Sequence, residues 1–478
     1  MAENKNVLLK LDNVKMHFPL KKSSLFQKER PYVKAVDGVS LDIYEGETFG
    51  LVGESGCGKS TLGRVILQLY AQTNGSIHYR GATLENYAPG YAFRDAARIP
   101  SVKGAAEEII EHFPAQAELA GGLLLSDDLQ SVERGLVDYL NAVKELNNLR
   151  NSKHLLVLKR DAYLESENLS AAEQSRLKRA ESKIKIFENE ITEAEAARDK
   201  RAEALSELNK PCSKKEGFDL LEEKLNISVD LSRLNKEEMR RLRRDLQIIF
   251  QDPYSSLNPR FTVGQLISEA LVAHSMYGRG TRQLEEYALD VMDKCGLQNY
   301  FLHRYPHQFS GGQRQRVGIA RALALQPRFV VCDEAVSALD VSIQSQIINL
   351  LIDLKQSANL TYMFISHDLS TVKFISDRVA VMYLGNLVEL GDSDEIFAMP
   401  LHPYTNALLE AIPTTEEASN KELQVIEGDI PSPINPPPGC KFHTRCKYAT
   451  EICSQEIPEW RELRERHWVA CHFPVTKE

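Results

Sequence analysis

The sequence predicts an α/β fold that carries a long helical insertion and a cysteine-rich tail. Residues 47–52 have the pattern of a short buried strand and are followed by a helical pattern, and residues 329–334 have that of an apolar strand ending in two carboxylates. Short apolar runs of this kind are typical of buried strands. Residues 85–240 are charge-rich and poor in glycine, and four of the eight cysteines fall at or after residue 440. These two departures from the α/β pattern indicate an insertion and a separate C-terminal segment.

Composition and charge narrow the functional class. The chain has 478 residues, 43% of them hydrophobic, and a formal net charge of −9, which suits a globular protein of about two to four domains. The acidic balance argues against non-specific nucleic-acid binding, which depends on a basic surface. No apolar run approaches the roughly 20 residues that cross a bilayer, and the first residues lack the apolar core of a signal peptide. We therefore expect a cytoplasmic protein whose membrane contacts come through partners.

Residues 53–61, with the sequence GESGCGKST, match the phosphate-binding pattern G-x-x-x-x-G-K-[ST]. Glycines allow successive backbone N–H groups to turn toward an anion. In this pattern Lys59 reaches the β- and γ-phosphates and Ser60 binds Mg²⁺. A strand is predicted before the loop and a helix over residues 62–70 after it, so that the N-terminus of the helix faces the phosphates. The predicted nucleotide-binding residues are Gly53, Glu54, Ser55, Gly56, Cys57, Gly58, Lys59, Ser60 and Thr61.

The segments around this loop are predicted to form a small antiparallel sheet. Residues 7–11 and 39–43 have strand patterns, and residues 75–81 form another predicted strand. Tyr32 is the candidate for stacking on an adenine ring, with Phe18 and Phe26 as competing candidates.

The insertion over residues 85–240 is predicted to be a helical hairpin. Apolar residues recur at three- and four-residue steps over 129–143 and again over 177–194. The segment Ser170-Ala-Ala-Glu has the capping-box pattern of a helix start. Two long helices joined near residues 168–169 would pack antiparallel. The pattern fits a docking arm and an insertion without a partner equally well.

Polar residues follow three further predicted strands. Gln251 follows the strand at 246–250, and Asp333 and Glu334 follow the strand that begins at 329. Asp333 can hold Mg²⁺ through water, and Glu334 can polarise an attacking water molecule. His367, at the end of the strand that begins at 362, is a candidate contact of the γ-phosphate.

A second anion site is predicted at residues 310–313, with the sequence SGGQ, where small residues begin a helix that runs to about residue 324. One nucleotide cannot easily use two such sites of one chain. The pattern therefore indicates a nucleotide site shared between two chains.

In this order, the motifs resemble those of the nucleotide-binding subunit of an ATP-binding-cassette (ABC) transporter. The resemblance implies an ABC-type P-loop NTPase fold, in which a RecA-like core carries an antiparallel β subdomain and a helical signature subdomain. Two such cassettes would enclose two ATP molecules. The family motifs map onto the Walker A loop 53–61, the Q-loop Gln251, the signature 310–313, the Walker B strand 329–334, the D-loop to Asp340 and the switch His367.

The resemblance also implies roles for these residues. Gln251, Glu334 and His367 would form the catalytic set. Ser60, Gln251 and Asp333 would coordinate Mg²⁺. The residues that serve the ATP of the partner cassette would be Ser310, Gly311, Gly312, Gln313 and Asp340.

A finer resemblance is to the ATPases of oligopeptide/dipeptide permeases, and it is carried by residues 31–40, 250–253, 256–260, 304–309, 401–405 and 431–440. The tail is similar to that of the F-type subunit, which pairs with a homologous second ATPase. The resemblance implies a peripheral ATPase on the cytoplasmic face of the plasma membrane, with two transmembrane permeases and an extracytoplasmic solute-binding protein. The chain departs from the family at Glu334-Ala335, where Glu-Pro is usual, and in the length of its insertion.

Four domains or subdomains are expected from these patterns. Residues 1–84 and 241–398 would form the nucleotide-binding domain, with its helical subdomain at about 262–324. Residues 85–240 would form the helical insertion, and residues 399–478 the C-terminal extension.

The four C-terminal cysteines have the spacing C-x5-C-x6-C-x17-C, and they are Cys440, Cys446, Cys453 and Cys471. Four thiolates can bind a [4Fe–4S] cluster or a tetrahedral zinc ion. Free thiols are a third alternative. Zinc sites favour closely paired cysteines, which this segment lacks, and the family resemblance favours the cluster. We expect a structural role, because a short proline-rich tail has little core of its own.

Two alternatives to peptide import remain at this point. A nickel importer is one, because related systems share these ATPases. A coiled-coil-bearing ATPase of DNA maintenance is the other, but there the coiled coil lies between the Q-loop and the signature, whereas here it precedes Gln251.

Overall fold

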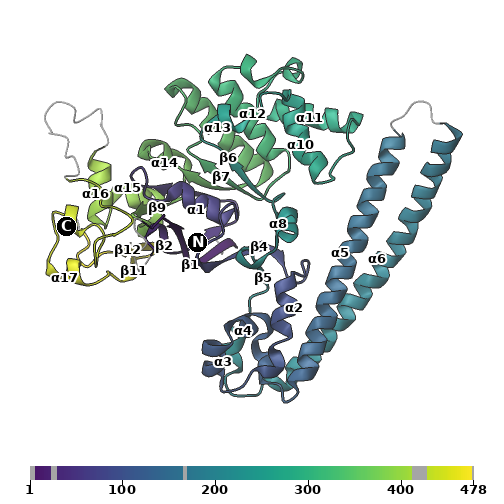
Figure 1. Cartoon of the computed structure of the whole chain (residues 1–478), viewed down its shortest axis with the longest axis horizontal. Coiled ribbons are helices and arrows are strands. Elements are labelled where there is room, and N and C mark those ends of the chain that lie inside the picture. Colours follow the sequence, from purple (N-terminus) through teal and green to yellow (C-terminus); the bar gives the residue numbers. More distant parts are fainter. Residues whose placement is uncertain (1–5, 23–29, 165–169, 412–427, 476–478) are drawn as a thin grey trace. The chain divides into compact units, whose positions relative to one another are not determined.

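The computed structural model describes residues 6–22, 30–164, 170–411 and 428–475, which divide into two compact units (Figure 1). Unit 1 comprises Met1–Ile77, Arg243–Ala270 and Ala288–Glu478, and unit 2 comprises His78–Leu242 and Leu271–Tyr287. Part of the predicted helical subdomain thus belongs to unit 2, and the predicted domain boundaries stay a prediction. No helix in the described ranges combines the length and apolar composition that a membrane span needs.

Unit 1 is built on an eight-stranded sheet with the order β11-β12-β10-β9-β3-β8-β7-β6. Its first five strands along the chain are parallel, and all residues of β3, β7, β8 and β9 are buried, as their continuous apolar runs predict. Because parallel strands end at the same edge, the residues that follow β3, β6, β7 and β8 are brought together. The strands are β3 (Thr48–Val52), β6 (Leu246–Ile249), β7 (Phe329–Asp333), β8 (Thr361–Ile365), β9 (Arg378–Tyr383), β10 (Asn386–Asp392), β11 (Trp460–Arg464) and β12 (His467–Ala470).

The predicted antiparallel strands are present. In unit 1, β1 (Val7–Pro19) pairs with β2 (Tyr32–Tyr44). β4 (Asn74–Thr83) begins in unit 1 and continues into unit 2, where β5 (Ser228–Asp230) pairs with it.

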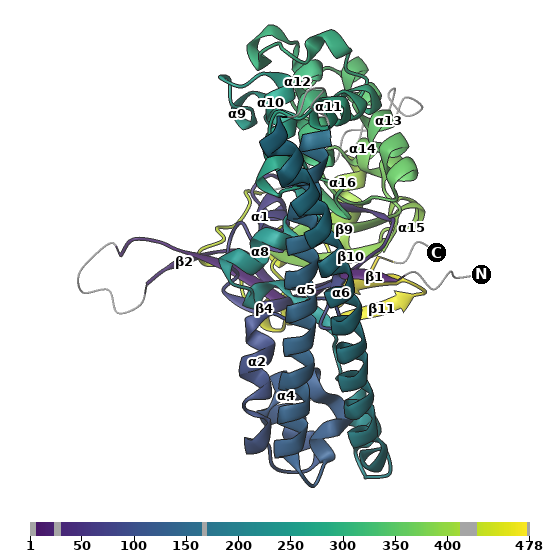
Figure 2. The same cartoon turned by 90° about the vertical axis from the view of Figure 1, so that its right-hand side faces the viewer.

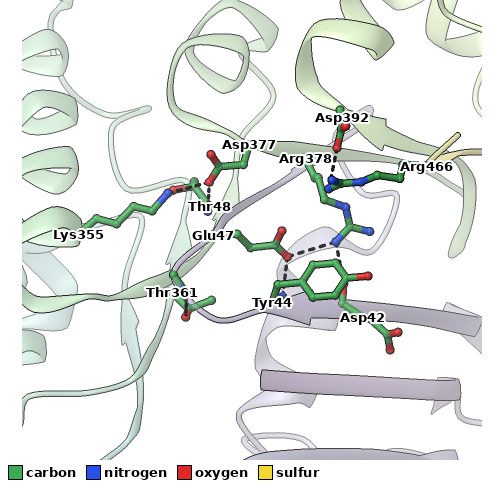
Figure 3. Close-up of polar contacts among 11 residues, drawn as sticks. Asp42, Tyr44, Glu47, Thr48, Lys355, Thr361, Asp377, Arg378, Asp392 and Arg466 are labelled. Carbon is green, nitrogen blue, oxygen red and sulfur yellow. Dashed lines mark hydrogen bonds and ion pairs between the residues drawn. The ribbon is translucent and has the colours of Figure 1, made fainter. Parts of the chain in front are cut away.

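A buried ion pair fixes the start of β3 (Figure 3). Arg378 Nη1 lies 3.3 Å from Glu47 Oε1, and the two side chains are 4% and 1% exposed. Arg378 also donates to the Asp42 carbonyl of β2 at 3.1 Å. Burial raises the pKa of Glu47, and the charge of Arg378 opposes this effect. The pair therefore holds β2 and β9 around the strand that leads into the phosphate-binding loop.

The helix after the loop, α1 (Lys59–Ile66), begins and ends earlier than the predicted range 62–70. It ends because Gln68 adopts a left-handed φ of 52°. The other helices of unit 1 are α9 (Pro253–Ser256), α12 (Gly311–Leu323), α13 (Val341–Ala358), α14 (Leu369–Ile375), α15 (Ser393–Ala398), α16 (Pro403–Glu410) and α17 (Glu451–Gln455), while α10 (Val263–Ala273) and α11 (Arg282–Lys294) are each divided between the units.

Two long helices dominate unit 2. α5 (Leu129–Leu164) and α6 (Ala171–Cys212) run side by side in both views (Figures 1 and 2). The ion pairs Arg150–Glu195 at 2.6 Å and Lys153–Glu188 at 2.9 Å fit an antiparallel pair. The predicted capping box at Ser170 is present, while the predicted joint at 168–169 lies outside the described residues.

Unit 2 also contains short helices that the sequence pattern did not predict. These are α2 (Gly90–Ala96), α3 (Ala106–His112), α4 (Pro114–Ala120), α7 (Phe218–Glu222) and α8 (Lys236–Leu242). Several of them pack with the first turns of α5 in one hydrophobic core. This core includes Tyr91, Ile99, Leu136, Leu140 and Leu221. Segments of five to seven residues are too short for a helical period to be recognised in the sequence.

The C-terminal tail continues the core sheet. β12 pairs with β10, Val469 opposite Glu389, and β11 pairs with β12. The buried His467 Nε2 lies 2.7 Å from Glu389 Oε1. The tail is therefore part of unit 1.

Candidate functional site

The phosphate-binding loop follows β3 and ends where α1 begins at Lys59. Gly53 and Gly58 have φ values of 149° and 109°. A Cβ on Gly53 would lie 2.2 Å from the Met382 carbonyl, and one on Gly58 would lie 2.0 Å from the Ala35 carbonyl. Glycine is therefore required at both positions. Lys59 is buried, and its Nζ donates to the carbonyls of residues 53 and 54 at 2.7 and 3.0 Å.

An open cavity of about 440 Å³ lies over the loop, a size that suits a nucleotide-like ligand. Gln251 and Glu334 line it together with the loop residues, as the parallel strand ends predict. The full lining is Phe18, Val33, Lys34, Ala35, Ser55, Gly56, Cys57, Gly58, Lys59, Ser60, Thr61, Gln251, Glu334, Leu384, Gly385 and Pro433.

Glu334 is the centre of a polar group at this edge of the sheet. Gln251 Nε2 donates to Glu334 Oε2 at 2.7 Å, and His367 Nδ1 lies 3.5 Å from the same oxygen. Glu334 has a left-handed φ of 49°, and its N–H donates to the Ile365 carbonyl at 3.0 Å. Strained backbone of this kind is concentrated at functional sites. The structure thus brings all three predicted catalytic residues together.

The predicted magnesium ligands are distributed over two positions. Ser60 and Gln251 line the cavity. Asp333 is 2% exposed, and Arg64 Nη2 lies 3.2 Å from its Oδ2, while its Oδ1 has no hydrogen-bond partner among the described residues. Asp333 thus has one carboxylate oxygen without a partner among the described residues, but that oxygen is buried and Asp333 does not line the cavity.

The signature residues lie outside the lining of this cavity. Ser310 caps α12 and forms a capping box with Gln313. A Cβ on Gly312 would lie 2.4 Å from Ile343, so that α12 and α13 approach closely there. Asp340 caps α13 through the Ile343 N–H at 3.0 Å. A role of residues 310–313 and Asp340 toward a partner's nucleotide stays a prediction.

Tyr32, the predicted adenine contact, is not among the residues that line this cavity, and its role stays a prediction. Tyr32 is exposed and pairs with Pro19 at the end of the β1–β2 ladder, one residue before the cavity-lining segment 33–35. Phe18 lines the cavity instead and packs edge-on against Tyr70 with ring centroids 5.5 Å apart. The other candidate, Phe26, lies outside the described residues.

Comparison with known proteins decides the family. The model of the ABC transporter family matches residues 36–211 and 203–337, which together cover more than half of the chain. The chain belongs to the ABC transporter ATPase family. Members of this family hydrolyse ATP to drive transport. A second family model, the C-terminal region of oligopeptide/dipeptide transporters, matches residues 388–453.

Individual relatives point to the same branch of ABC ATPases. The oligopeptide transport ATP-binding protein AppF of Bacillus subtilis is 36% identical over 474 residues, covering 99% of both chains. YkfD of B. subtilis, named for oligopeptide transport, is 36% identical and covers 98% of this chain and 95% of its own. The peptide import ATP-binding protein BOV_A0347 of Brucella ovis is 51% identical over 244 residues, 51% of this chain and 76% of its own. The nickel and DNA-maintenance alternatives gain no support from these relatives.

In this ABC ATPase, all four C-terminal cysteines line one cavity, and His402 lines it as well. The N–H groups of Phe442, Tyr448 and Phe473 bond to the sulfurs of the cysteines two positions before them. Burial raises the pKa of the thiols of Cys440 and Cys446, and that of Cys471 to about 12. Within the described ranges, no group of three or more His, Cys, Asp or Glu side chains is arranged to hold a metal ion.

His402 presents an unused polar atom to the cysteine cavity. Its side chain is 1% exposed, and its Nδ1 accepts the Tyr404 N–H at 3.0 Å at the start of α16. Burial lowers the pKa of His402 to about 4, so that the ring is neutral and the proton sits on Nε2. Nε2 has no hydrogen-bond partner in the described part of the chain. A buried donor of this kind is costly unless a ligand satisfies it.

Sequence reasoning missed several residues of the ABC ATPase site. Arg64 contacts Asp333, Pro433 lines the nucleotide cavity, and Arg445 and Tyr404 contact Glu54 of the loop. Most of these residues lie hundreds of positions from their partners. Tyr404 and Pro433 belong to segments that carry the finer resemblance, but nothing in those segments places them at the loop.

Proposed function

We propose that this chain is the ATP-hydrolysing subunit of an importer for oligopeptides or dipeptides. The observation that carries the proposal is the similarity to AppF over 99% of both chains. The match of residues 388–453 to the C-terminal region of oligopeptide/dipeptide transporters supports it independently of the cassette.

In this proposal the cavity over the loop binds ATP. Lys59 and the loop N–H groups hold the phosphates, and Mg²⁺, held by Ser60, Gln251 and Asp333, neutralises phosphate charge when bound. Glu334 accepts the proton of the attacking water. Its distances to Gln251 and His367 support this role, because both groups fix the same carboxylate oxygen.

A homologous second ATPase completes the site. The signature residues 310–313 and Asp340 act on the ATP of that partner, which is supported by their position outside this chain's own cavity. Two permease subunits and a solute-binding protein complete the importer, and the ATPase lies on the cytoplasmic face of the membrane through its contact with the permeases.

We further propose that Cys440, Cys446, Cys453 and Cys471 hold a [4Fe–4S] cluster. Three observations support the fit: four thiols around one cavity, N–H groups facing three of the sulfurs, and the unsatisfied Nε2 of His402. The cluster would tie the segments of the tail together.

A transport assay tests the proposal that the chain powers a peptide importer. The complex is purified through a tag on this chain and reconstituted in vesicles with ATP on the side of this subunit. Labelled di- and oligopeptides should enter in an ATP-dependent way, and Glu334→Gln should abolish uptake. Uptake of Ni²⁺ instead of peptides, or ATP hydrolysis that drives neither, would contradict the proposal.

Metal analysis of the same anaerobic preparation tests the cluster. We expect about four irons per chain, their loss in Cys446→Ser and their retention in the matched control Cys212→Ser, since Cys212 lies in unit 2. Zinc without iron would contradict the cluster and leave the importer proposal standing.

A further inference from the structure

The C-terminal extension holds the phosphate-binding loop at Glu54. The Arg445 guanidinium donates twice to the Glu54 carboxylate, from Nη1 to Oε2 at 2.7 Å and from Nη2 to Oε1 at 3.0 Å. The Tyr404 hydroxyl accepts the Glu54 backbone N–H at 2.9 Å. The side chain and the backbone of one loop residue are thus both fixed by residues about 350 to 390 positions away.

Arg445 is itself held in place. Its side chain is 5% exposed, against 20% for Glu54. It also donates to the Tyr383 hydroxyl at 3.5 Å. The ring of Phe442 packs against Tyr383 and Tyr404, with centroids 5.3 and 5.2 Å away. Two parallel charge-assisted bonds from a buried guanidinium give a strong and geometrically specific contact.

The Glu54 peptide unit connects this contact to the phosphate-binding lysine. Lys59 Nζ donates to the carbonyl of Glu54 at 3.0 Å. A rotation of Glu54 would therefore move the carbonyl that Lys59 contacts and the N–H groups that follow it in the loop. The charge of the Glu54 carboxylate matters as well. Without the guanidinium beside it, this negative charge would repel the negatively charged triphosphate that the loop binds.

We propose that Arg445, acting through Glu54, is a positioning residue that sets the affinity of the phosphate-binding loop for ATP. It neutralises the Glu54 carboxylate and fixes the orientation of its peptide unit. It does not line the nucleotide cavity, and its contacts with Glu54 lead to the phosphate-binding loop, so we expect it to affect ATP binding rather than the chemical step.

Steady-state ATP hydrolysis by the assembled complex tests the proposal. For Arg445→Ala we expect the KM for ATP to rise about tenfold and kcat to change less than twofold, since charge-assisted hydrogen bonds are about twice as strong as neutral ones. Arg445→Lys should give an intermediate KM, because lysine keeps the positive charge but cannot donate two parallel hydrogen bonds to the carboxylate. Adding Glu54→Gln to Arg445→Ala should lower KM again by removing the uncompensated charge.

The matched control is Arg466→Ala in the same extension. Arg466 pairs with Asp392 at 3.0 Å, and both side chains are about 40% exposed, so KM should stay unchanged. An unchanged KM in Arg445→Ala, a fall in kcat alone, or no recovery in the double variant would overturn the proposal. Thermal unfolding is measured for each variant, and if Arg445→Ala does not fold, an unchanged KM in Arg445→Lys overturns it instead.

Discussion

Replacing Glu334 by glutamine isolates the chemical step of ATP hydrolysis. Glutamine keeps the volume of the side chain and an acceptor oxygen for the 2.7 Å bond from Gln251 Nε2. The backbone turn also stays, because it is fixed by the N–H bond to the Ile365 carbonyl. The amide cannot accept a proton from water at neutral pH. The substitution therefore removes proton transfer and leaves the geometry of the site in place.

The expected magnitude follows from the role of a general base, which contributes about 10²- to 10⁴-fold to a rate. We expect kcat to fall by that factor, which corresponds to about 2.7–5.4 kcal/mol in the activation free energy. The affinity for ATP should change less than about twofold, because Lys59 and the loop N–H groups are untouched. Phosphate release and equilibrium ATP binding are measured on the complex, with the partner ATPase inactivated so that residual hydrolysis belongs to this chain.

Glu45→Gln serves as the control, because Glu45 pairs with Arg328 at 2.9 Å and does not line the nucleotide cavity. Hydrolysis at the wild-type rate in Glu334→Gln would refute the assignment of Glu334 as the base. A large loss of ATP affinity would refute the view that the carboxylate acts on water only.

Three further predictions concern the scaffold, the loop and the cysteines. Arg378→Met should lower the free energy of unfolding by about 3–5 kcal/mol, because it leaves a buried carboxylate unpaired. Burial already raises the pKa of Glu47, and a raised pKa favours the protonated acid in the folded state as pH falls. In urea unfolding, the difference in the free energy of unfolding between the wild type and Arg378→Met should therefore be smaller at pH 5 than at pH 8. Equal differences at the two pH values would contradict this. Gly58→Ala should weaken ATP binding at least tenfold in a titration, since the new Cβ would lie 2.0 Å from a main-chain carbonyl; unchanged affinity would show that the loop can shift. Cys446→Ser, next to Arg445, should raise the KM for ATP under anaerobic conditions. In the double variant it should not raise KM beyond the effect of Arg445→Ala. Additive effects would show that the cysteine cavity and the loop are not coupled.

The sequence was sufficient for the parts of the site that follow from strand order. A phosphate-binding pattern between a strand and a helix placed Lys59 and Ser60, and the family resemblance grouped Gln251 with Glu334. In the structure both line one cavity, because their strands are parallel and end at the same edge. The choice between Tyr32 and Phe18 as the adenine contact could not be made from the sequence, because the distance of each ring from the loop depends on the register of the β1–β2 pair.

Contacts between distant segments were beyond sequence reasoning. The bonds of Arg445 and Tyr404 to Glu54 depend on how the tail packs against the core sheet, and neither residue belongs to a periodic pattern. The same holds for fold elements. The long apolar repeats predicted α5 and α6, whereas the short helices α2 and α3 carry too few turns to be recognised.

One glutamate–arginine pair lies just before β3 and another just after it, at the start of the phosphate-binding loop. The two pairs differ in burial, and this difference indicates different roles. Glu47 precedes β3, and its pair with Arg378 is 1% and 4% exposed, whereas Glu54 follows β3, and its pair with Arg445 is 20% and 5% exposed. A fully buried pair cannot separate without leaving a charge uncompensated, so the first pair is a permanent part of the scaffold. In the second pair Glu54 is partly exposed, so the loss of Arg445 costs the fold less than the loss of Arg378, while the Glu54 charge then lies unpaired in the phosphate-binding loop. Arg378→Met should thus change the free energy of unfolding more than the KM for ATP, and Arg445→Ala should do the reverse.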